Sequence, residues 1–195
     1  MQTRDFLRDQ IRQRRQGLSA SERLQASQDL ARQLLALVEL VPHARVAGYW
    51  ATGGEISLHA WLIQRPDVAF FLPCLQSGRM LRFAEWRVGA PLRVNRFGIP
   101  EPEVGGEHLC EAQQIDVILM PLLAFDRTGA RLGMGGGYYD RTCAFRQRQA
   151  MPPLLVGVAY HWQEQERLSA ESWDVPMDVI ATDRELIRVA LGNRR

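Results

Sequence analysis

A glycine-rich loop constrains what this chain can fold into more than any other feature of its sequence. Residues 131–140 are RLGMGGGYYD, with glycine at four of the five positions from Gly133 to Gly137. Glycine has no side chain and admits positive φ, so the backbone N–H groups of such a loop can converge on an anion. The apolar run over 115–120 indicates a buried strand before the loop. A strand, a glycine loop and then a helix are typical of a phosphate site in an α/β protein.

Two common nucleotide motifs do not match this loop. A P-loop requires Gly-x-x-x-x-Gly-Lys-Ser/Thr, but the chain contains no lysine. A dinucleotide fingerprint that began at Gly133 would require glycine at position 138, where Tyr138 stands. The sequence therefore predicts a phosphate-binding loop of another type. A tight turn with glycines at positive φ and no ligand is the alternative.

The length and composition fit one domain of ordinary size that covers residues 1–195. The formal net charge of +2 and the lack of a long basic tract argue against a dedicated nucleic-acid surface. No segment has the pattern of a signal peptide or the roughly 18–20 apolar residues of a membrane span. Three cysteines, far apart, suit a reducing compartment and form no disulfide framework. We expect a cytoplasmic protein and a monomer, without a membrane or nucleic-acid partner.

Hydrophobic periodicity and capping residues predict alternating helices and strands. Helices are expected over 3–16, from Ser19 to Pro42, over 57–64 and over 140–149. Strands are expected over 45–50, 68–72, 80–86, 115–120, 154–159 and 179–182, the third as an exposed edge or hairpin strand. Residues 93–106 are expected to form an ordered loop. This alternation predicts an α/β fold with a mostly parallel sheet that is covered on both faces.

The first expected helix carries a row of arginines. Arg4, Arg8, Arg12 and Arg15 are spaced four, four and three residues apart, beside an apolar stripe. A row of cations there could contact a ligand at the edge of the domain. A solvated helix face fits the same pattern equally well.

Six segments, in order along almost the whole chain, resemble the 5-formyltetrahydrofolate cyclo-ligase family, also called 5,10-methenyltetrahydrofolate synthetase. The main segment is Pro121–Arg141, PLLAFDRTGARLGMGGGYYDR, which contains the glycine loop. The others are Leu7–Arg8, Gly53–Ile56, Phe97–Pro102, Val156–Ala159 and Asp174–Asp178. A single glycine loop would be weak support, whereas six ordered segments together are specific.

The resemblance implies a cytosolic ligase that uses ATP and Mg²⁺. Its substrate would be 5-formyltetrahydrofolate, and its products 5,10-methenyltetrahydrofolate, ADP and phosphate. Phosphorylation of the formyl oxygen would turn a poor leaving group into a good one, and N10 would then close the ring. Such catalysis depends mainly on positioning and on neutralising charge. The implied fold is a single three-layer α/β/α domain with a mostly parallel mixed sheet of the NagB/RpiA/CoA-transferase-like type.

The resemblance also implies roles for particular residues. The ATP site would comprise Arg4, Arg8, Arg131, Leu132, Gly133, Met134, Gly135, Gly136, Gly137, Tyr138 and Tyr139, with Arg131 and Tyr138 catalytic. The folate site would comprise Trp50, Glu55, Met134, Gly135, Gly136, Gly137 and Tyr138. The family often has lysine where Arg4 stands, and some members have lysine at the position of Gly136, whose part another arginine could take.

Four of these residues have clear chemistry, although each also has a structural interpretation. Glu55 can accept hydrogen bonds from a pterin, and Trp50 can pack on its flat face. Asp140 and Asp174 would hold Mg²⁺, which prefers oxygen ligands. Without the resemblance, Trp50 would be interpreted as core, Glu55 as a loop carboxylate, Asp140 as a helix cap and Asp174 as a turn residue. His161, at a strand end, is expected to be structural.

Two alternative functions remain open at this stage. One is a catalytically inactive nucleotide- or RNA-binding module on the same fold, which would use exposed arginines for backbone contacts. The other is an ATP-dependent enzyme that acts on another N-formyl or pterin substrate. The joint presence of Glu55, the glycine loop, Asp140 and Asp174 favours the ligase over a pure binding module.

Overall fold

The structure is a computed structural model that describes residues 3–149 and 151–190. Its helices are α1 (Arg4–Gln16), α2 (Ala20–Leu35), α3 (His59–Leu62) and α4 (Tyr138–Thr142). Short 3₁₀ turns lie at Ser77–Arg79, Gly106–His108, Ala112–Gln114, Ala144–Gln147 and His161–Gln163. The expected domain over 1–195 also includes residues 1, 2, 150 and 191–195, which lie outside the described residues.

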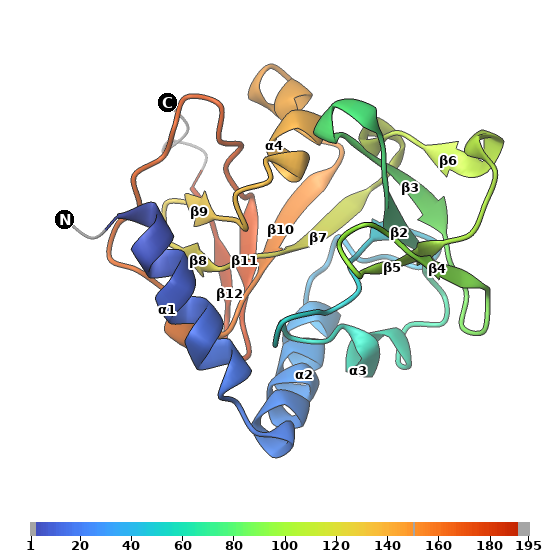
Figure 1. Cartoon of the computed structure of the whole chain (residues 1–195). Coiled ribbons are helices and arrows are strands. Elements are labelled where there is room, and N and C mark those ends of the chain that lie inside the picture. The colour runs from blue at the N-terminus through green and yellow to red at the C-terminus, as the bar shows by residue number, and fades with distance from the viewer. Residues whose placement is uncertain (1–2, 150, 191–195) are drawn as a thin grey trace.

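One large sheet organises the described part of the chain (Figure 1). Its strands are β1 (Arg45–Ala47), β2 (Ala69–Leu75), β3 (Leu81–Glu85), β6 (Leu109–Cys110), β7 (Val117–Pro121), β10 (Leu154–Val158), β11 (Val179–Ala181) and β12 (Leu186–Arg188). They lie in the order β12-β11-β10-β7-β1-β2-β3-β6. From β11 to β2 neighbouring strands are parallel, and the outer strands are antiparallel. The predicted α/β fold with a mostly parallel mixed sheet is confirmed.

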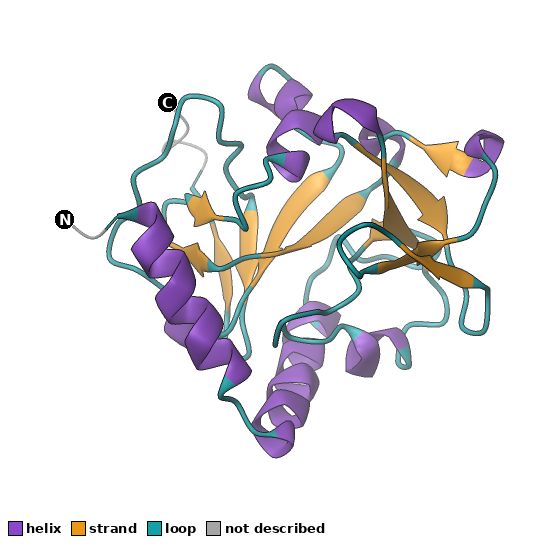
Figure 2. Cartoon of the chain, in the orientation of Figure 1, coloured by secondary structure: helices purple, strands orange, loops and turns teal. Residues whose placement is uncertain are grey.

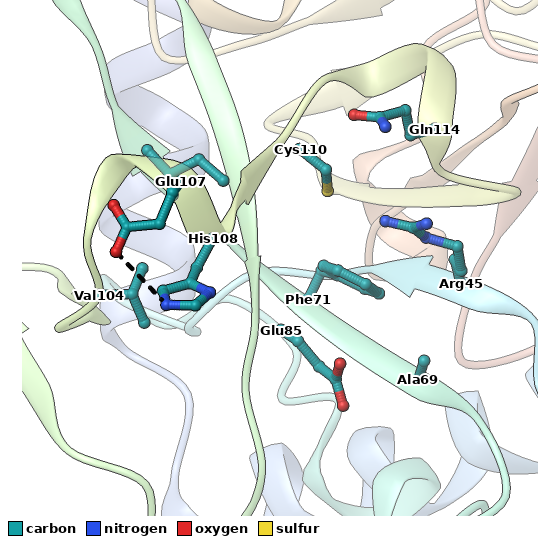
Figure 3. A pocket seen from close by; sticks show the side chains of 10 residues that line it. Arg45, Ala69, Phe71, Glu85, Val104, Glu107, His108, Cys110 and Gln114 are labelled. Carbon is teal, nitrogen blue, oxygen red and sulfur yellow. Dashed lines mark ion pairs between the residues drawn. The ribbon is translucent and has the colours of Figure 1, made fainter.

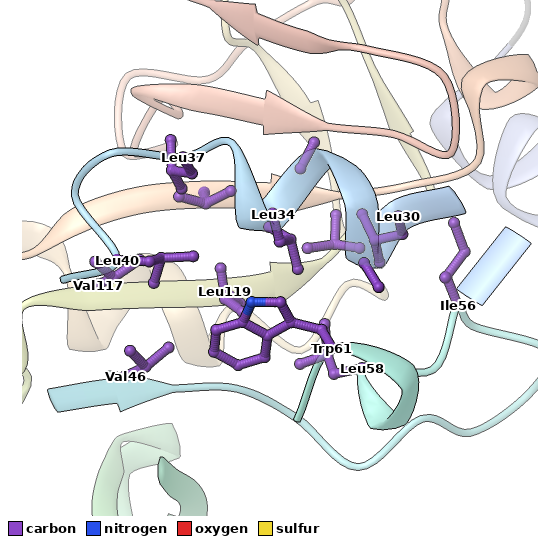
Figure 4. Packing of buried hydrophobic residues seen from close by; sticks show 14 of the residues in the cluster. Leu30, Leu34, Leu37, Leu40, Val46, Ile56, Leu58, Trp61, Val117 and Leu119 are labelled. Atoms are coloured by element: carbon purple, nitrogen blue, oxygen red, sulfur yellow. The ribbon is translucent and has the colours of Figure 1, made fainter. Parts of the chain in front are cut away.

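Helices cover both faces of this sheet because its parallel strands are apolar on both sides. In β1, Val46 packs on the face covered by α2 and α3, and Ala47 packs on the opposite face. Figure 2 shows α2 and α3 on one side of the sheet and α4 on the other. On the first face, the buried Trp61 of α3 packs with Leu34 of α2 and with strand residues (Figure 4). The second face is covered by α4 and 3₁₀ turns rather than by long helices.

The predicted caps of the first two helices are present, but α2 is shorter than predicted. The Thr3 side chain accepts a hydrogen bond from the Phe6 amide, and Ser19 and Glu22 form the expected capping box. Helix α2 ends at Leu35 rather than at Pro42. Successive tight turns follow, in which the amides of residues 37 and 40 bond to carbonyls three residues earlier. The apolar positions past 35 therefore belong to a turn that buries Leu37 and exposes Val41.

Four other elements differ from the sequence-based expectation. The expected loop over 93–106 contains a hairpin of β4 (Leu92–Val94) and β5 (Pro100–Pro102). The expected edge strand over 80–86 is a hairpin partner of β2, but the two-residue strand β6 covers its other side. The helix expected over 140–149 begins earlier, at Tyr138, and its second half is a 3₁₀ turn. Strand β12, with only three residues, was not predicted.

The path of the chain creates a switch point between β1 and β7. From β1 the chain continues to β2 on one side, and it later returns to β7 on the other side. Loops that leave the carboxyl ends of such strands diverge, and ligands of open α/β sheets bind in the resulting crevice. The turn at Gly53–Glu55 follows β1. The small hairpin of β8 (Ala124–Phe125) and β9 (Arg131–Leu132), followed by the glycine loop, comes after β7.

Helix α1 packs against this small hairpin and away from the main core (Figure 1). Its Ile11 lies in a cluster with Leu123, Ala124 and Leu132. This contact directs the arginines of α1 toward the segments that follow β1 and β7. No helix in the described ranges is long and apolar enough to cross a membrane.

Candidate active site

Arginine side chains hold the carbonyl groups of the glycine loop. The Nε atom of Arg8 donates to the Gly133 carbonyl at 3.0 Å. One nitrogen of Arg141 donates to the carbonyls of Gly136 and Gly137, each at 3.1 Å, and Arg12 lies 3.5 Å from the Met134 carbonyl. The loop is therefore fixed through its acceptors, by cations from α1 and α4.

The amide groups of the same loop have no acceptor among the described residues. Across residues 3–149 and 151–190, no backbone N–H from Gly133 to Gly137 donates a hydrogen bond to another described group. Gly135 and Gly137 have φ of 92° and 67°, conformations that favour glycine. Adjacent N–H groups without partners in a conformation of this kind can bind an anion. The loop thus has the free N–H groups that the expected phosphate site requires, while several of its carbonyl groups accept hydrogen bonds from arginines.

The two carboxylates expected to hold Mg²⁺ are paired with two of the expected ATP-binding arginines. Arg131, 7 % exposed, donates to Oδ1 of Asp140 at 2.7 Å, and Arg4 donates to Oδ2 of Asp174 at 3.2 Å. The Val175 amide also lies 3.3 Å from Oδ1 of Asp140, which brings the two segments together. The other oxygen of each carboxylate takes part in no hydrogen bond among the described residues.

The carboxylates of Asp140 and Asp174 fit a magnesium ion that is also bound to the phosphates of a nucleotide. No group of three or more His, Cys, Asp or Glu residues that could hold a metal occurs in the described ranges. A dedicated protein cage would need such a group, whereas Mg²⁺ bound to substrate phosphates usually takes one or two carboxylates and keeps several waters. The free oxygens of Asp140 and Asp174 supply that number.

Glu55 lies in a buried polar cluster in the turn that follows β1. Its Oε2 accepts from the Thr52 amide at 2.9 Å, and its Oε1 lies 3.8 Å from the guanidinium of Arg15. Burial raises the pKa of the Glu55 carboxyl, and the Thr52 hydrogen bonds and the Arg15 charge oppose this rise. Burial disfavours the charged form of Arg15 as well, which lowers the pKa of its guanidinium. Gly54 packs on the Arg15 backbone so closely that a Cβ there would lie 2.7 Å from its carbonyl oxygen.

Three aromatic side chains lie around this turn. Trp50 is 38 % exposed, in edge-to-face contact with Trp86 at 5.7 Å, so it is available to a ligand. The interpretation of Trp50 as core is therefore wrong. Tyr49 and Tyr139 approach Glu55, and burial together with the Glu55 charge raises the pKa of both phenols. Tyr139, from the glycine loop, thus lies near the expected folate residue.

Helix α1 contacts both the glycine loop and the turn that carries Glu55. Arg8 contacts the glycine loop, and Arg15 contacts Glu55. Seven residues of helix at a rise of 1.5 Å separate the two positions by roughly 10 Å along the axis. The row of arginines on α1 is therefore not a freely solvated face.

The expected catalytic Tyr138 contacts a segment that the sequence did not associate with the site. Arg96, between β4 and β5, donates to the Tyr138 hydroxyl, and Phe97 lies edge-to-face with the Tyr138 ring at 5.8 Å. Arg96 also lies over the Phe97 ring at 5.0 Å. The hairpin that the sequence analysis interpreted as a loop thus brings a cation to the glycine loop.

Arg96 and Arg141 had no assigned role, and Arg15 was expected only as a member of the row of cations on α1. One signal could have identified Arg15, because it lies four residues after the buried Ile11 and therefore on the packed side of α1. No local pattern marks Arg96 or Arg141. The Nδ1 atom of His161, which is expected to be structural, lies 2.8 Å from Oδ2 of Asp183.

Two cavities of the described structure differ in position. The larger, about 600 Å³, is lined by Arg45 and Ala69, the first residues of β1 and β2 (Figure 3). It therefore lies at the amino-terminal ends of these strands, whereas the glycine loop comes after the carboxyl end of β7. The smaller, about 180 Å³, is lined by Arg4 and Arg131, two of the expected ATP-binding residues. The larger of the two cavities therefore does not coincide with the expected ATP site.

The sequence matches the 5-formyltetrahydrofolate cyclo-ligase family over residues 1–183. The chain belongs to this family. It is 37% identical over 182 residues to the 5-formyltetrahydrofolate cyclo-ligase of Haemophilus influenzae, a match that covers 90% of this chain and 95% of the relative. It is 34% identical to the enzyme of the same name from Escherichia coli K12, with 88% and 96% covered.

Solved structures agree with this assignment. The 5,10-methenyltetrahydrofolate synthetase of Aquifex aeolicus superposes with a TM-score of 0.80 at 33% identity, and the match covers 95% of this chain and 92% of that one. The synthetase of Mycoplasma pneumoniae gives 0.72 at 26% identity, over 94% and 100%. The resemblance inferred from six sequence segments is confirmed, and the protein is an enzyme of the cyclo-ligase family.

Proposed function

We propose that this protein converts 5-formyltetrahydrofolate to 5,10-methenyltetrahydrofolate and consumes ATP with Mg²⁺. One observation carries the proposal. The glycine loop with its free amides and the turn that carries Glu55 follow β7 and β1, the two strands at the switch point, and both segments contact α1, through Arg8 and Arg15. This supports the proposal, because an anion site and an acceptor for a pterin would then belong to one site, as a reaction between a nucleotide and a folate requires.

The proposed reaction has two steps. The formyl oxygen attacks the γ-phosphorus of ATP, a P–O bond forms, and the bond to ADP breaks. N10 of the folate then attacks the activated formyl carbon and loses its proton as the new C–N bond forms, and the C–O bond breaks to release phosphate. Both steps place negative charge on phosphate oxygens, so amides and cations that are already oriented lower the barrier.

We assign the residues of this chain as follows. The free N–H groups of Gly133–Gly137 bind phosphate oxygens, with Arg4 and Arg8 from α1 nearby. Arg131 and Tyr138 act at the transferring phosphoryl group. Tyr138 is oriented by Arg96, and Arg131 by Asp140.

Leu132, Met134 and Tyr139 complete the walls of the proposed nucleotide site. For the folate, Glu55 accepts hydrogen bonds from the pterin, and the half-exposed Trp50 packs on its face. Glu55 must be ionised for this, and Arg15 favours that form.

Asp140 and Asp174 would hold Mg²⁺ through the carboxylate oxygens that have no described protein partner. The ion would neutralise phosphate charge when it is bound. A location in the reducing cytoplasm is also part of the proposal, and it rests on the three buried, unpaired cysteines.

An absorbance assay tests the proposed reaction. The purified protein is mixed with 5-formyltetrahydrofolate and ATP, with and without Mg²⁺, and the appearance of the methenyl product is followed. We expect turnover only with all three components. Product formation without ATP, or none with all three, would reject the proposal.

A matched pair of variants tests the assignment of Glu55. Glu55→Gln removes the charge with little change in size, and Glu103→Gln does the same at an exposed position. We expect Glu55→Gln to lower kcat/KM for folate roughly a hundredfold, which corresponds to two charge-assisted hydrogen bonds of about 1.5 kcal/mol each. ATP affinity should not change, and Glu103→Gln should behave as the wild type. Equal kinetics of the two variants would remove Glu55 from the folate site.

A further inference from the structure

The smaller cavity, next to the start of the glycine loop, has an unusual composition. It lies between the amino-terminal turn of α1, strand β9 and the segment 165–169. Three arginines line it, Arg4, Arg131 and Arg167, together with neutral residues. No acidic side chain is among its lining residues.

The larger cavity differs from the smaller one, because acidic residues are among its lining. There Arg45 and His108 are accompanied by Glu85 and Glu107. In the smaller cavity the carboxylates that pair with Arg4 and Arg131 lie outside the lining. The residues that line the cavity are therefore only positive or neutral, which favours an anion.

Arg167 differs from the other two arginines in its pairing. Arg4 has an aspartate and a glutamate partner, and Arg131 has an aspartate partner. Arg167 is exposed and forms no ion pair or side-chain hydrogen bond with another described residue. Because its charge is not neutralised by a carboxylate, it is free to pair with a ligand. The Nε atom of Arg4 is also buried without a hydrogen-bond partner among the described groups.

Helix α1 adds a further positive contribution. Thr3, its N-cap residue, and Arg4, its first residue, both line the cavity. The amino-terminal end of a 13-residue helix carries partial positive charge from its free N–H groups and is a favourable place for an anion.

The size of the cavity limits what the ligand can be. A volume of about 180 Å³ corresponds to roughly six water molecules at about 30 Å³ each. Pockets that enclose a drug-sized ligand measure about 300–1,000 Å³. The cavity can therefore take a phosphate chain but not a complete nucleotide.

We propose that Arg167 is a further phosphate-binding residue, which with Arg4 and Arg131 forms a pocket for the phosphate chain of the nucleotide. This inference rests on the proposed ATP-dependent function and extends it. Arg167 lies 28 residues beyond the last residue of the expected nucleotide loop, Tyr139, and belongs to a segment for which no role was expected. It supplies a third cation to a pocket next to a loop that has no arginine or lysine of its own between Leu132 and Tyr139.

Inorganic triphosphate is a suitable probe, because it has the phosphate chain without the nucleoside. Its dissociation constant is measured by calorimetry on the full chain, for the wild type, Arg167→Ala, Arg167→Lys and the control Arg148→Ala. Arg148 is another exposed arginine without a described ion pair, and it does not line the cavity. We expect Arg167→Ala to weaken triphosphate binding about tenfold, as the loss of one charge-assisted hydrogen bond does.

Arg167→Lys retains the charge and should lose only part of the affinity, and Arg148→Ala should bind as the wild type. The KM for ATP should rise in Arg167→Ala while the KM for folate stays constant. The proposed phosphate pocket would be contradicted if the wild type did not bind triphosphate, or if Arg167→Ala and Arg148→Ala bound it equally.

The same experiment separates the pocket from the proposed function. If triphosphate binds and Arg167→Ala weakens it, but the protein shows no ATP-dependent turnover, the pocket stands and the proposed function fails. If turnover depends on ATP and Arg167→Ala leaves the KM for ATP and the triphosphate affinity unchanged, the function stands and the pocket fails.

Discussion

The guanidinium of Arg15 lies 3.8 Å from the carboxylate of Glu55, and the two side chains are only 2% and 9% exposed. The pair joins α1 to the turn after β1, two segments that are 40 residues apart in sequence. Removal of one member of a buried ion pair leaves an uncompensated charge, which usually costs more than the pair contributes. Arg15 therefore matters both for the packing of α1 and for the ionisation of Glu55.

The first prediction concerns the pH dependence of folate binding. Burial raises the pKa of Glu55, and the positive charge of Arg15 lowers it. Because only the ionised carboxylate accepts two hydrogen bonds, folate affinity should fall as the pH falls through the pKa of Glu55. Arg15→Gln removes the opposing charge, so the affinity should be lost at a higher pH than in the wild type. Equilibrium titrations with folate between pH 5 and pH 8 measure both midpoints.

Tyr49, Tyr139 and Tyr160 also surround this pair, but burial raises the pKa of each phenol, so they stay neutral in that range. Arg15→Lys keeps the charge and should restore a midpoint near that of the wild type. Arg32→Gln, on the exposed side of α2, serves as the control. A midpoint for Arg15→Gln that coincides with that of Arg32→Gln would show that Arg15 does not act on Glu55.

The second prediction separates backbone strain from phosphate binding in the glycine loop. Gly135 and Gly89 have φ of 92° and 89°, so alanine should be strained to a similar extent at both, by ~1–3 kcal/mol. Only Gly135 belongs to the loop with free amides. Gly135→Ala should raise the KM for ATP roughly tenfold, and Gly89→Ala should not change it. Equal KM values with equal losses of stability would mean that the Gly135 segment is only a turn.

The sequence was most informative where local chemistry decides the structure. Thr3 and Ser19 cap α1 and α2 as predicted, because a capping hydrogen bond involves residues only three positions apart. The central strands also follow from their apolar runs, since a strand that is buried on both faces has few polar positions. The family resemblance then supplied the expected site, which periodicity alone could not.

Long-range pairing explains what the sequence did not predict. The hairpin of β4 and β5 has prolines at both ends of its second strand and exposed side chains in its first, so it lacks an alternating pattern. Strand β12 is a strand because its three residues pair with the outer edge of β11. Arg96 contacts Tyr138 across 42 positions, and no spacing along the chain signals such a contact.

The third prediction tests the core between α2 and the sheet. Leu34 is fully buried in the cluster shown in Figure 4, whereas Leu24 on the same helix is 61 % exposed. Leu34→Ala should lower the free energy of unfolding by about 3 kcal/mol, because it removes packed methyl groups and leaves a cavity. Leu24→Ala should change it by less than about 0.5 kcal/mol. Urea unfolding of both variants measures the difference, and similar values would contradict the described packing.

The fourth prediction concerns the three cysteines, all of which are buried. Burial raises the pKa of Cys74 to about 11 and that of Cys143 to about 12, and it also raises the pKa of Cys110. The thiolate is the form that reacts with iodoacetamide, so at pH 8 the folded protein should be labelled very slowly. In urea all three thiols should react. Mass spectrometry of labelled peptides checks this, and rapid labelling of Cys74 in the native protein would contradict its burial.

The fifth prediction concerns Asp140 and the metal. In Asp140→Asn the free oxygen that would contact Mg²⁺ loses its charge, and Arg131 loses its ionised partner. The Mg²⁺ concentration for half-maximal turnover should therefore rise about tenfold or more, because the hard cation prefers ionised carboxylates. Asp29→Asn is the control, since Asp29 also pairs with an arginine, Arg32, but on α2 and away from the loop. Thermal unfolding of both variants separates a loss of stability from a loss of metal affinity. If the Mg²⁺ titration curve of Asp140→Asn matches that of Asp29→Asn, Asp140 serves only as the partner of Arg131.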